Sequence, residues 1–437
     1  MAADRYDVVV VGGGPAGIAA ACTAADGERR VAIIDENPAP GGQIWRATEN
    51  NWTRRLRAAP IILLPSTRIV DAPAPGALLA ETRDSSGELE YRKLVLATGG
   101  RECFLPFPRW TLPGVFGAGG LQSLVKTGLP VRGKRVVVAG TGPLLLAVAA
   151  FLRNQGAVVP VIAEQASAGA LCCFLAGLIR EPGKLAQAVV MRATLAAVPY
   201  RTSSWITAVH GEHNVTGVTL NTGQTWACDY VACGFGLVPN TELAQLLGCD
   251  LRGAFVVVDR YQQTSVANVL CAGEPTGIGG VDAALLEGQI AGFAATDRHR
   301  EADALHRRRD DSFAARLEHA FALRPELKTL APPDTIVCRC EDVPLAALRA
   351  HGSWRAAKLQ SRCGMGPCQG RVCGPAVRYL LGWQPESVRP PILPARLSSL
   401  AAGEWRVTGR SRLPAGARQP AHARASTHTA PRRSTPS

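Results

Sequence analysis

The chain has 437 residues, 47% of them hydrophobic, so it is long enough for two or three domains with cores of their own. Its net charge is +13, but seven arginines and a single acid fall in residues 403–437, a Pro-, Ser-, Thr- and Ala-rich tail that we predict to be disordered. Outside this tail no basic stripe is interleaved with aromatic residues, so composition argues against a nucleic-acid-binding protein.

The apolar stretches of the chain predict neither a targeting sequence nor a membrane span. No basic segment precedes the first stretch, and Gly12-Gly13-Gly14-Pro15 interrupts it. The second stretch, 136–152, is also interrupted by glycine and is shorter than a bilayer requires. We therefore expect a cytoplasmic protein, in which thiols stay reduced and available to a cofactor.

Residues 6–34 have the pattern of a dinucleotide-binding βαβ unit. An apolar strand, 6–11, is followed by Gly12-x-Gly14-x-x-Gly17, an Ala-rich helix to residue 25 and a second strand, 31–34. The first glycine permits a tight turn, the second lets the backbone approach a pyrophosphate, and the third lets the helix pack closely on the strand. The complete unit predicts a dinucleotide-binding fold.

An acidic pair follows the second strand of this unit. Asp35 stands where a carboxylate can accept hydrogen bonds from the ribose hydroxyls of the dinucleotide, and the adjacent Glu36 is the alternative.

The same pattern recurs at residues 135–164. A strand, 135–139, leads to Gly140-Thr141-Gly142-Pro143, a helix and a further strand before Glu164. Leu145 stands where the third glycine is expected, so the helix cannot pack as closely on the strand. The second unit therefore binds NAD, binds another adenine nucleotide such as ATP, or is retained as a scaffold. No basic residue follows Glu164 closely, which argues against NADP.

Two later strands end in small-residue turns, at Ala97-Thr98-Gly99 and at Gly273-Glu274. These segments resemble the thioredoxin-reductase-like flavoproteins, which have two dinucleotide-binding domains. The resemblance implies that the first turn marks the crossover near FAD and that the second meets the ribityl chain, although Glu274 replaces the more frequent Asp. A helix after Gly279-Gly280 would point its positive end at the flavin.

Five cysteines lie close together near the end of the chain, at Cys338, Cys340, Cys363, Cys368 and Cys373. Thiolates on short glycine-rich loops are suited to an iron–sulfur cluster or to structural zinc. No Cys-x-x-Cys pair of the kind usual in zinc ribbons occurs in the chain, so we favour iron–sulfur over zinc or over plain buried thiols.

The Cys338-Arg339-Cys340-Glu341 start and the Gly364-to-Cys373 end of this region resemble the 2Fe-2S module of the bacterioferritin-associated-ferredoxin type. Such modules occur in the alpha subunits of heteromeric dehydrogenases of the opine oxidase, hydroxyproline or proline dehydrogenase and hydrogen cyanide synthase type. The resemblance implies that Cys338, Cys340, Cys368 and Cys373 are the ligands, with Cys363 as a spare.

We therefore predict an α/β protein with two Rossmann-like domains, one inserted in the other, and a small helical cluster module. The predicted segments are an FAD-binding domain at 1–125 and 240–300, a second nucleotide-binding domain at 126–239, a linker at 301–334, the 2Fe-2S module at 335–385, a proline-rich extension at 386–402 and the tail at 403–437. The predicted cofactor contacts are Gly12, Gly14, Pro15, Ala16, Gly17, Asp35, Glu36, Gly42, Gln43, Ala97, Thr98, Gly99, Gly140, Gly142, Glu164, Gly273 and Glu274.

No catalytic constellation accompanies these cofactor motifs. The chain shows no redox-active cysteine pair beside the flavin motif and no Ser/His/Asp or paired-carboxylate arrangement. We expect an FAD- and 2Fe-2S-containing electron-transfer subunit whose partner, by the resemblance of the D-amino-acid-oxidase type, oxidises an amino or imino acid. The alternative is a stand-alone NAD(P)H-dependent flavoprotein reductase that passes electrons through its own cluster.

Overall fold

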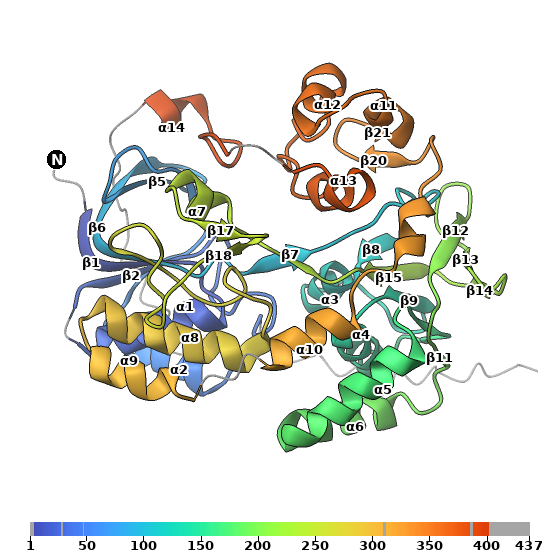
Figure 1. The fold of residues 1–437 in the computed structure, drawn as a ribbon, viewed down its shortest axis with the longest axis horizontal. Coiled ribbons are helices and arrows are strands. Elements are labelled where there is room, and N and C mark those ends of the chain that lie inside the picture. Colours follow the sequence, from blue (N-terminus) through green and yellow to red (C-terminus); the bar gives the residue numbers. More distant parts are fainter. Residues whose placement is uncertain (1–3, 28, 47, 309–311, 385–387, 402–437) are drawn as a thin grey trace, which may run out of the picture.

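Two sheets, each covered by helices, form most of the molecule (Figure 1); the first is mixed, because β4, β5 and β6 pair antiparallel. The computed structural model describes residues 4–27, 29–46, 48–308, 312–384 and 388–401. The first sheet has the order β3-β2-β1-β6-β5-β4, and β19 pairs with the other end of β6. Its strands are β1 (Asp4–Val11), β2 (Val31–Ile34), β3 (Ile62–Leu64), β4 (Arg68–Asp71), β5 (Ala77–Glu81), β6 (Ser86–Leu96) and β19 (Val269–Cys271).

Helices α1 (Pro15–Ala25) and α8 (Gly280–Ala295) pack closely against each other beside this sheet. Two glycines of α8 make this possible. A Cβ atom on Gly288 would lie 2.2 Å from the Ala16 carbonyl oxygen, and one on Gly292 would lie 2.6 Å from that of Ala20. Side chains at these positions would push the helices apart, so α8 holds α1 and its preceding loop in place. Helices α2 (Asn51–Ala58) and α9 (His299–His306) lie beside them.

The second sheet is parallel throughout, with the order β11-β10-β9-β15-β8. Its strands are β8 (Val115–Gly117), β9 (Val136–Gly140), β10 (Ile162–Glu164), β11 (Tyr200–Arg201) and β15 (Tyr230–Gly234), and α3 (Ala118–Lys126) and α4 (Pro143–Asn154) pack beside it. Strand β8, which lies within the segment predicted for the first domain, pairs with β15 in the second sheet. The sheet to which a three-residue strand belongs depends on the strand with which it pairs, and the local sequence does not show that partner.

Smaller elements complete the second unit. They are α5 (Ala168–Gly177), η1 (Leu178–Arg180), α6 (Pro182–Thr194), β12 (Ile206–His210), β13 (Gly217–Leu220) and β14 (Thr225–Ala227). The predicted linker at 301–334 contains α10 (Ser312–Ala320) and η2 (Pro325–Thr329). Helix α10 packs on α5, where the Phe174 ring lies 6.0 Å from that of Phe313. This segment is therefore largely ordered and packed.

The chain passes between the two units along a pair of short antiparallel strands. Strand β7 (Gly100–Glu102) leaves the first unit, and β16 (Leu237–Pro239) returns to it, with Gly100 opposite Pro239. Strand β16 is therefore the return crossing. It leads into α7 (Glu242–Leu246), β17 (Leu251–Arg252) and β18 (Phe255–Val256).

The cysteine-rich region forms a small unit with a core of its own, which we call the cysteine module. It contains β20 (Ile336–Cys338), β21 (Val343–Pro344), α11 (Leu345–Arg349), α12 (Trp354–Ser361) and α13 (Cys373–Leu381). Leu345, Leu348, Ala357 and Val377 are buried in it together with three of the cysteines. Figure 1 shows this module beside the ends of β7 and β8, at the junction of the two nucleotide-binding units.

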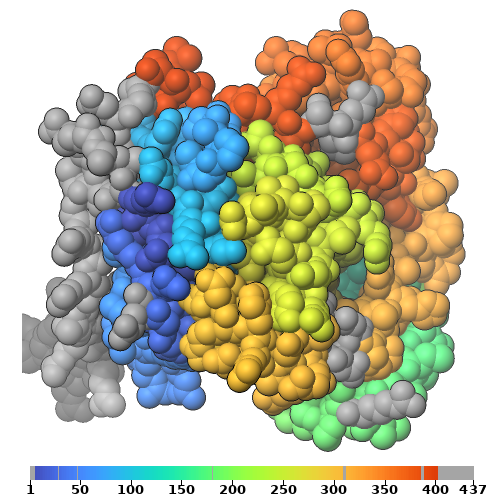
Figure 2. All heavy atoms as spheres, turned by 60° about the vertical axis from the view of Figure 1, so that its left-hand side comes forward, coloured from blue at the N-terminus to red at the C-terminus, as the bar shows by residue number. Residues whose placement is uncertain are grey.

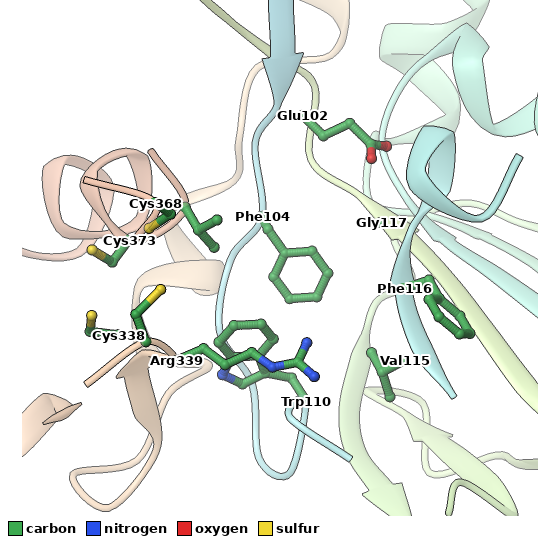
Figure 3. A pocket seen from close by; sticks show the side chains of 12 residues that line it. Glu102, Phe104, Trp110, Val115, Phe116, Gly117, Cys338, Arg339, Cys368 and Cys373 are labelled. Carbon is green, nitrogen blue, oxygen red and sulfur yellow. The ribbon is translucent and has the colours of Figure 1, made fainter. Parts of the chain in front are cut away.

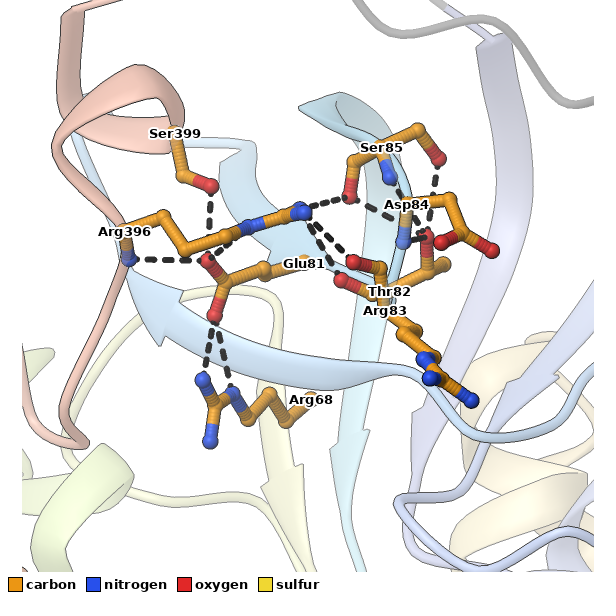
Figure 4. A network of polar contacts seen from close by, with 8 residues as sticks. All are labelled: Arg68, Glu81, Thr82, Arg83, Asp84, Ser85, Arg396 and Ser399. Carbon is orange, nitrogen blue, oxygen red and sulfur yellow. Dashed lines mark hydrogen bonds and ion pairs between the residues drawn. The ribbon is translucent and has the colours of Figure 1, made fainter.

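The segment after the module returns to the first unit, where α14 (Leu397–Ala401) lies on β5. Glu81 anchors it (Figure 4): its carboxylate accepts from Ser399 Oγ at 2.7 Å and from Arg396 Nε at 3.1 Å, and Arg68 NH2 lies 2.6 Å from its other oxygen. Figure 2 shows this red segment beside the light-blue surface of the first unit. The predicted disordered tail lies outside the described residues, and no helix among the described residues is long and apolar enough to cross a membrane.

Candidate functional site

The glycine loop between β1 and α1 has the geometry of a phosphate-binding turn. A Cβ atom on Gly12 would lie 2.1 Å from the Ala97 carbonyl oxygen, and one on Gly17 would lie 1.8 Å from that of Gly12. At Gly14 the same test meets no atom within 4 Å. Gly12 and Gly17 are thus required for packing, whereas Gly14 borders open space at the N-terminus of α1, where a pyrophosphate can approach. The residues present fit a dinucleotide.

The two acids after β2 have different surroundings. Asp35 is buried, and its carboxylate accepts from the Gly13 N–H at 2.8 Å and from the Asn37 N–H and Nδ2, also at 2.8 Å. Glu36 is exposed and lines a cavity of about 300 Å³ together with Ser66 and four other residues. Asp35 therefore braces the glycine loop, and Glu36 is the acid whose carboxylate faces open space.

Three further predicted segments meet the glycine loop. Gly42 would place a Cβ atom 3.1 Å from Gly14 Cα, and the adjacent Gln43 is exposed. The Ala97-Thr98-Gly99 turn touches the loop through the Ala97 carbonyl. Glu274 accepts a hydrogen bond from the Gly100 N–H, and burial raises the pKa of its carboxyl. All of these segments therefore lie around one site, although they are far apart in sequence.

One residue of this site was not expected from the sequence. The Glu287 carboxylate, buried on α8, accepts from the Gly273 N–H at 2.7 Å and from Thr276 Oγ1 at 2.9 Å. It fixes the turn that contains Glu274, in which the Thr276 N–H donates to the Gly273 carbonyl at 2.9 Å. The only signal in the sequence is an acid beside Gly288 in the middle of a mostly apolar helix.

The second glycine loop is tight at one position and open at another. A Cβ atom on Gly140 would lie 1.8 Å from the Gly234 carbonyl oxygen, whereas one on Gly142 meets nothing within 4 Å. Leu145, which replaces the third glycine, is 1% exposed and packs in the core between α4 and the sheet. A leucine side chain therefore lies where a third glycine would let the helix approach the strand more closely.

Glu164 is enclosed in the protein. It is 0% exposed, and its carboxylate accepts from Thr141 Oγ1 at 2.8 Å, from the Gly142 N–H at 2.9 Å and from the Ala166 N–H at 2.8 Å. Burial raises its pKa, which these hydrogen bonds lower in part. Both oxygens are occupied within the fold, so Glu164 braces the second loop as Asp35 braces the first.

All five cysteines of the module come together. The sulfurs of Cys338, Cys363 and Cys373 all lie within 4.8 Å of one another, and Cys363 Sγ is 3.8 Å from Cys373 Sγ. Cys340 and Cys368 form a second group, joined by a side-chain hydrogen bond. The sequence prediction ranked Cys363 fifth, yet it lies beside two predicted ligands. The donors are all thiols, which is the chemistry that iron–sulfur clusters and structural zinc require.

Backbone N–H groups surround these sulfurs. Hydrogen bonds from the Cys363 and Cys373 thiols lower the pKa of Cys338 to about 2, with further donation from the Gly364 and Glu341 N–H groups. A Cβ atom on Gly366 would lie 2.4 Å from Cys340 Cβ, so only glycine allows this approach. The N–H groups and tight turns suit an anionic centre.

A cavity of about 500 Å³ separates the cysteine module from the second unit (Figure 3). Cys338, Cys340, Cys368 and Cys373 line it, whereas Cys363 does not. Figure 3 shows labelled cysteines on one side, Val115 and Phe116 on the other, and Phe104 and Trp110 between them. The four predicted ligands therefore share this face of the module.

Glu102 closes another part of the cavity wall. Its carboxylate accepts from the Gly119 N–H at 2.6 Å and from the Gly120 N–H at 3.0 Å, in the first turn of α3. Burial raises the pKa of this carboxyl. Glu102 therefore already satisfies the positive end of α3.

The profile of the pyridine nucleotide-disulphide oxidoreductases matches residues 6–288, which include both glycine loops. The chain belongs to this family. It is an FAD-dependent oxidoreductase, and the family relation supports binding of FAD and of NAD(P). The predicted α/β fold with two Rossmann-like domains is confirmed.

Among curated members of the family, the A subunit of opine oxidase from Rhizobium meliloti (strain 1021) is 32% identical, over 91% of this chain and 98% of the relative. The HcnB subunit of hydrogen cyanide synthase from Pseudomonas aeruginosa is 30% identical, over 84% and 90%. Both were among the types that the sequence resembled, so that prediction is confirmed.

Two solved structures show the shared fold. The L-proline dehydrogenase from P. horikoshii matches with a TM-score of 0.68 and 20% identity, covering 92% of this chain and 81% of that one. The thioredoxin reductase of T. acidophilum matches with a TM-score of 0.51 and 21% identity, covering 67% and 98%. The first match extends beyond the two nucleotide-binding units.

The family's disulphide chemistry has no counterpart among the described cysteines outside the module. All 13 cysteines are free. Cys228 and Cys233, five residues apart, are fully buried, and burial raises the pKa of both thiols. Both thiols pack as small apolar side chains in the core of the second unit.

Proposed function

We propose that this chain is the FAD- and 2Fe-2S-containing electron-transfer subunit of a heteromeric dehydrogenase or oxidase for an amino or imino acid. The substrate class is that of hydroxyproline, proline, opines or glycine. The observation that carries the proposal is the gathering of five thiols in one module, four of which line a cavity at the junction of two nucleotide-binding units. The relatives named as subunits support a multi-subunit enzyme.

The flavin would be held by the first glycine loop with Gly12, Gly14, Pro15, Ala16 and Gly17 and by the residues that converge on it. In this arrangement Glu36, rather than the enclosed Asp35, accepts from the ribose hydroxyls, and Glu274 faces the turn at Gly99-Gly100. FAD supplies two-electron chemistry that can be divided into single-electron transfers. Purified protein should be yellow and should release FAD on denaturation. A colourless preparation that FAD does not reconstitute would contradict this part of the proposal.

The cluster ligands in this proposal remain Cys338, Cys340, Cys368 and Cys373, because these four line the cavity while Cys363 lies behind them. Each ligand Cys→Ser variant should lose iron and its electron paramagnetic resonance signal. Cys363→Ser is the matched control and should keep both. If Cys363→Ser loses the cluster while Cys340→Ser or Cys368→Ser keeps it, the buried group of three thiols supplies the ligands instead. Stoichiometric zinc in anaerobically purified protein would rule out the redox role.

The substrate would be oxidised on a partner protein of the D-amino-acid-oxidase type. In support of this, Glu102 is the only carboxylate among the described residues that line the cavity beside the cysteines. Backbone N–H groups of α3 already donate hydrogen bonds to both of its oxygens. Co-expression with candidate partners, co-purification and a dye-linked dehydrogenase screen over amino and imino acids tests the assignment. Robust turnover of such a substrate by this chain alone would overturn it.

A stand-alone NAD(P)H-dependent reductase is the second candidate, and the open space at Gly142 favours it. The enclosure of Glu164 weighs against it, since that carboxylate is fully used inside the fold. The second unit then binds NAD or ATP weakly, or serves as scaffold. Rapid NADH oxidation by the isolated chain would favour the reductase. ATP protection against thermal unfolding, without NADH oxidation, would favour the electron-transfer role.

A further inference from the structure

One partly buried guanidinium joins the flavin-side turn to the cysteine module. Arg101 lies on β7, and its side chain is 24% exposed. Its NH1 donates to Asn240 Oδ1 at 2.6 Å and lies 2.9 Å from Glu242 Oε1, and its Nε donates to the Arg371 carbonyl at 3.2 Å. Three segments that are distant in sequence thus meet at a single side chain.

On the flavin side, Asn240 carries the connection to the predicted crossover turn. Its Nδ2 donates to the Thr98 carbonyl at 2.9 Å, its own N–H donates to the Gly99 carbonyl at 2.9 Å, and its carbonyl accepts from Thr98 Oγ1 at 2.5 Å. This turn touches the glycine loop through Ala97. Asn240 therefore clamps the turn from three directions.

On the cysteine side, Arg371 lies inside the loop between Cys368 and Cys373. Its backbone N–H donates to the Cys368 carbonyl at 3.0 Å, and its NH2 donates to the Ile392 carbonyl at 2.8 Å. Its Nε is 4.0 Å from Glu242, the acid that also pairs with Arg101. The loop that carries two predicted ligands is thus tied to Arg101 through one carbonyl and one shared carboxylate.

We propose that Arg101 is a positioning residue that holds the Cys368–Cys373 loop at a fixed separation from the Thr98–Gly99 turn and so governs electron transfer between the flavin and the cluster. This inference rests on the proposed function. A reduced flavin bound at the first glycine loop would give up one electron at a time, a cluster bound by the cysteines would accept it, and the proton lost from the flavin would pass to solvent. Because electron transfer between two bound groups slows as their separation grows, loosening this connection should lower the rate.

The planar fork of arginine is essential to this role. Lysine would keep a positive charge near Glu242, but a single ammonium at the end of a flexible chain cannot hold Asn240 and the Arg371 carbonyl in the same directions. Glutamine would remove the charge and leave Glu242 to Arg371 alone. We therefore expect partial function in Arg101→Lys and less in Arg101→Gln.

The experiment measures the rate of flavin-to-cluster electron transfer after flash photoreduction with deazaflavin, in the full chain. Arg101→Gln should slow it by more than about twofold, and Arg101→Lys by less, with flavin and iron contents unchanged. Hydrogen exchange in residues 363–373 should increase in both variants, a readout that does not require turnover. The matched control is Arg316→Gln, since Arg316 is 23% exposed and paired with Glu181 on the second unit, away from both cofactors.

The outcomes separate this inference from the proposed function. The positioning role would be overturned, and the proposed function left intact, by two results together. They are an electron-transfer rate in Arg101→Gln within about twofold of the unsubstituted chain and hydrogen exchange in residues 363–373 no greater than in Arg316→Gln. A stability loss equal to that of Arg316→Gln, with no change in rate, would likewise make Arg101 a structural residue only. An unsubstituted protein that contains no cluster, or whose flavin never reduces it, would overturn both.

Discussion

The two nucleotide-binding units of this chain begin with the same motif but pack it differently. In the first, Gly17 lets α1 lie against the loop so closely that a Cβ atom would be 1.8 Å from the Gly12 carbonyl. In the second, Leu145 occupies the equivalent place and is buried in the core. Both units keep a glycine beside open space, Gly14 and Gly142.

The acids at the ends of the second strands differ less than the sequence suggests. Asp35 and Glu164 both accept backbone N–H groups of their own glycine loops. In the first unit, Asp35 is followed by a second, exposed acid, Glu36, beside a cavity. In the second unit, Glu164 is followed by Gln165, which is not an acid. A loop can therefore keep its shape while the group that would recognise a ribose is present in one unit and lacking at the corresponding position in the other.

The largest expected effect comes from removing close packing in the first unit. Gly17→Val places a Cβ atom 1.8 Å from the Gly12 carbonyl oxygen. The surrounding helices leave no room for the backbone to move and relieve this clash. We expect no folded, flavin-containing protein. Soluble expression and circular dichroism check this. A yellow Gly17→Val protein with an unchanged circular dichroism spectrum would contradict the described packing.

Gly14→Val should separate folding from binding. Gly14 has an ordinary φ of −76° and its added side chain meets no protein atom, so the chain should fold. The valine would occupy the space of the pyrophosphate, and flavin content should fall below about a tenth of normal. Flavin fluorescence after denaturation measures the content, with circular dichroism as the control for folding. Normal flavin content would place the pyrophosphate elsewhere.

Leu145→Ala tests the equivalent position in the second unit. Truncating a buried leucine leaves a cavity and should lower the free energy of unfolding by about 2–5 kcal/mol. Flavin content should not change, because the first unit is separate. Urea denaturation followed by far-ultraviolet circular dichroism measures the loss. A flavin-free Leu145→Ala protein would mean that the second unit shapes the first site.

Glu36→Gln should weaken FAD binding, whereas Glu164→Gln should lower the stability of the fold. Losing a charged acceptor at Glu36 should weaken FAD affinity by about tenfold, since a hydrogen bond to a charged group contributes about 1.5–3 kcal/mol. Glu164→Gln should leave FAD affinity unchanged and lower stability, because its amide would face backbone N–H donors. Titration of the apoprotein with FAD compares the two variants. If Asp35→Asn alone weakens binding while Glu36→Gln does not, the ribose acid has been assigned to the wrong residue.

The smallest expected effect concerns pH. At Glu81, burial raises the pKa, but hydrogen bonds from Ser399, Arg396 and Arg68 outweigh it and lower the value to about 2, from an ordinary 4.5. Its contribution to stability is therefore present above pH 4.5 and lost as pH falls towards 2. Glu164, with a raised pKa, has the opposite sign and favours the folded state at low pH.

Glu81→Gln should flatten the acid side of the stability curve. The urea concentrations at the midpoint of unfolding at about pH 5 and about pH 3 should then differ less than in the unsubstituted protein. Proteolytic cleavage near residues 388–401, the segment that Glu81 anchors, should increase at both pH values. An unchanged difference between the two midpoints would show that other carboxylates dominate acid unfolding.

Both βαβ units, the loss of the third glycine at Leu145 and the cluster of cysteines could be predicted from the sequence. These features depend on short-range periodicity and on residue types that a turn or helix requires locally, so a few neighbouring residues suffice to specify them. The match of the family profile to residues 6–288 confirms the fold that they predicted.

Which side chains meet could be learned only from the folded chain. Folding placed β8 in the second sheet, brought Cys363 beside Cys338 and Cys373, enclosed Asp35 while exposing Glu36, and gathered Asn240, Glu242 and the Arg371 carbonyl around Arg101. Each of these results depends on contacts between segments far apart in the chain. The packing of whole elements sets such distances to within about an ångström, and no local pattern carries that information.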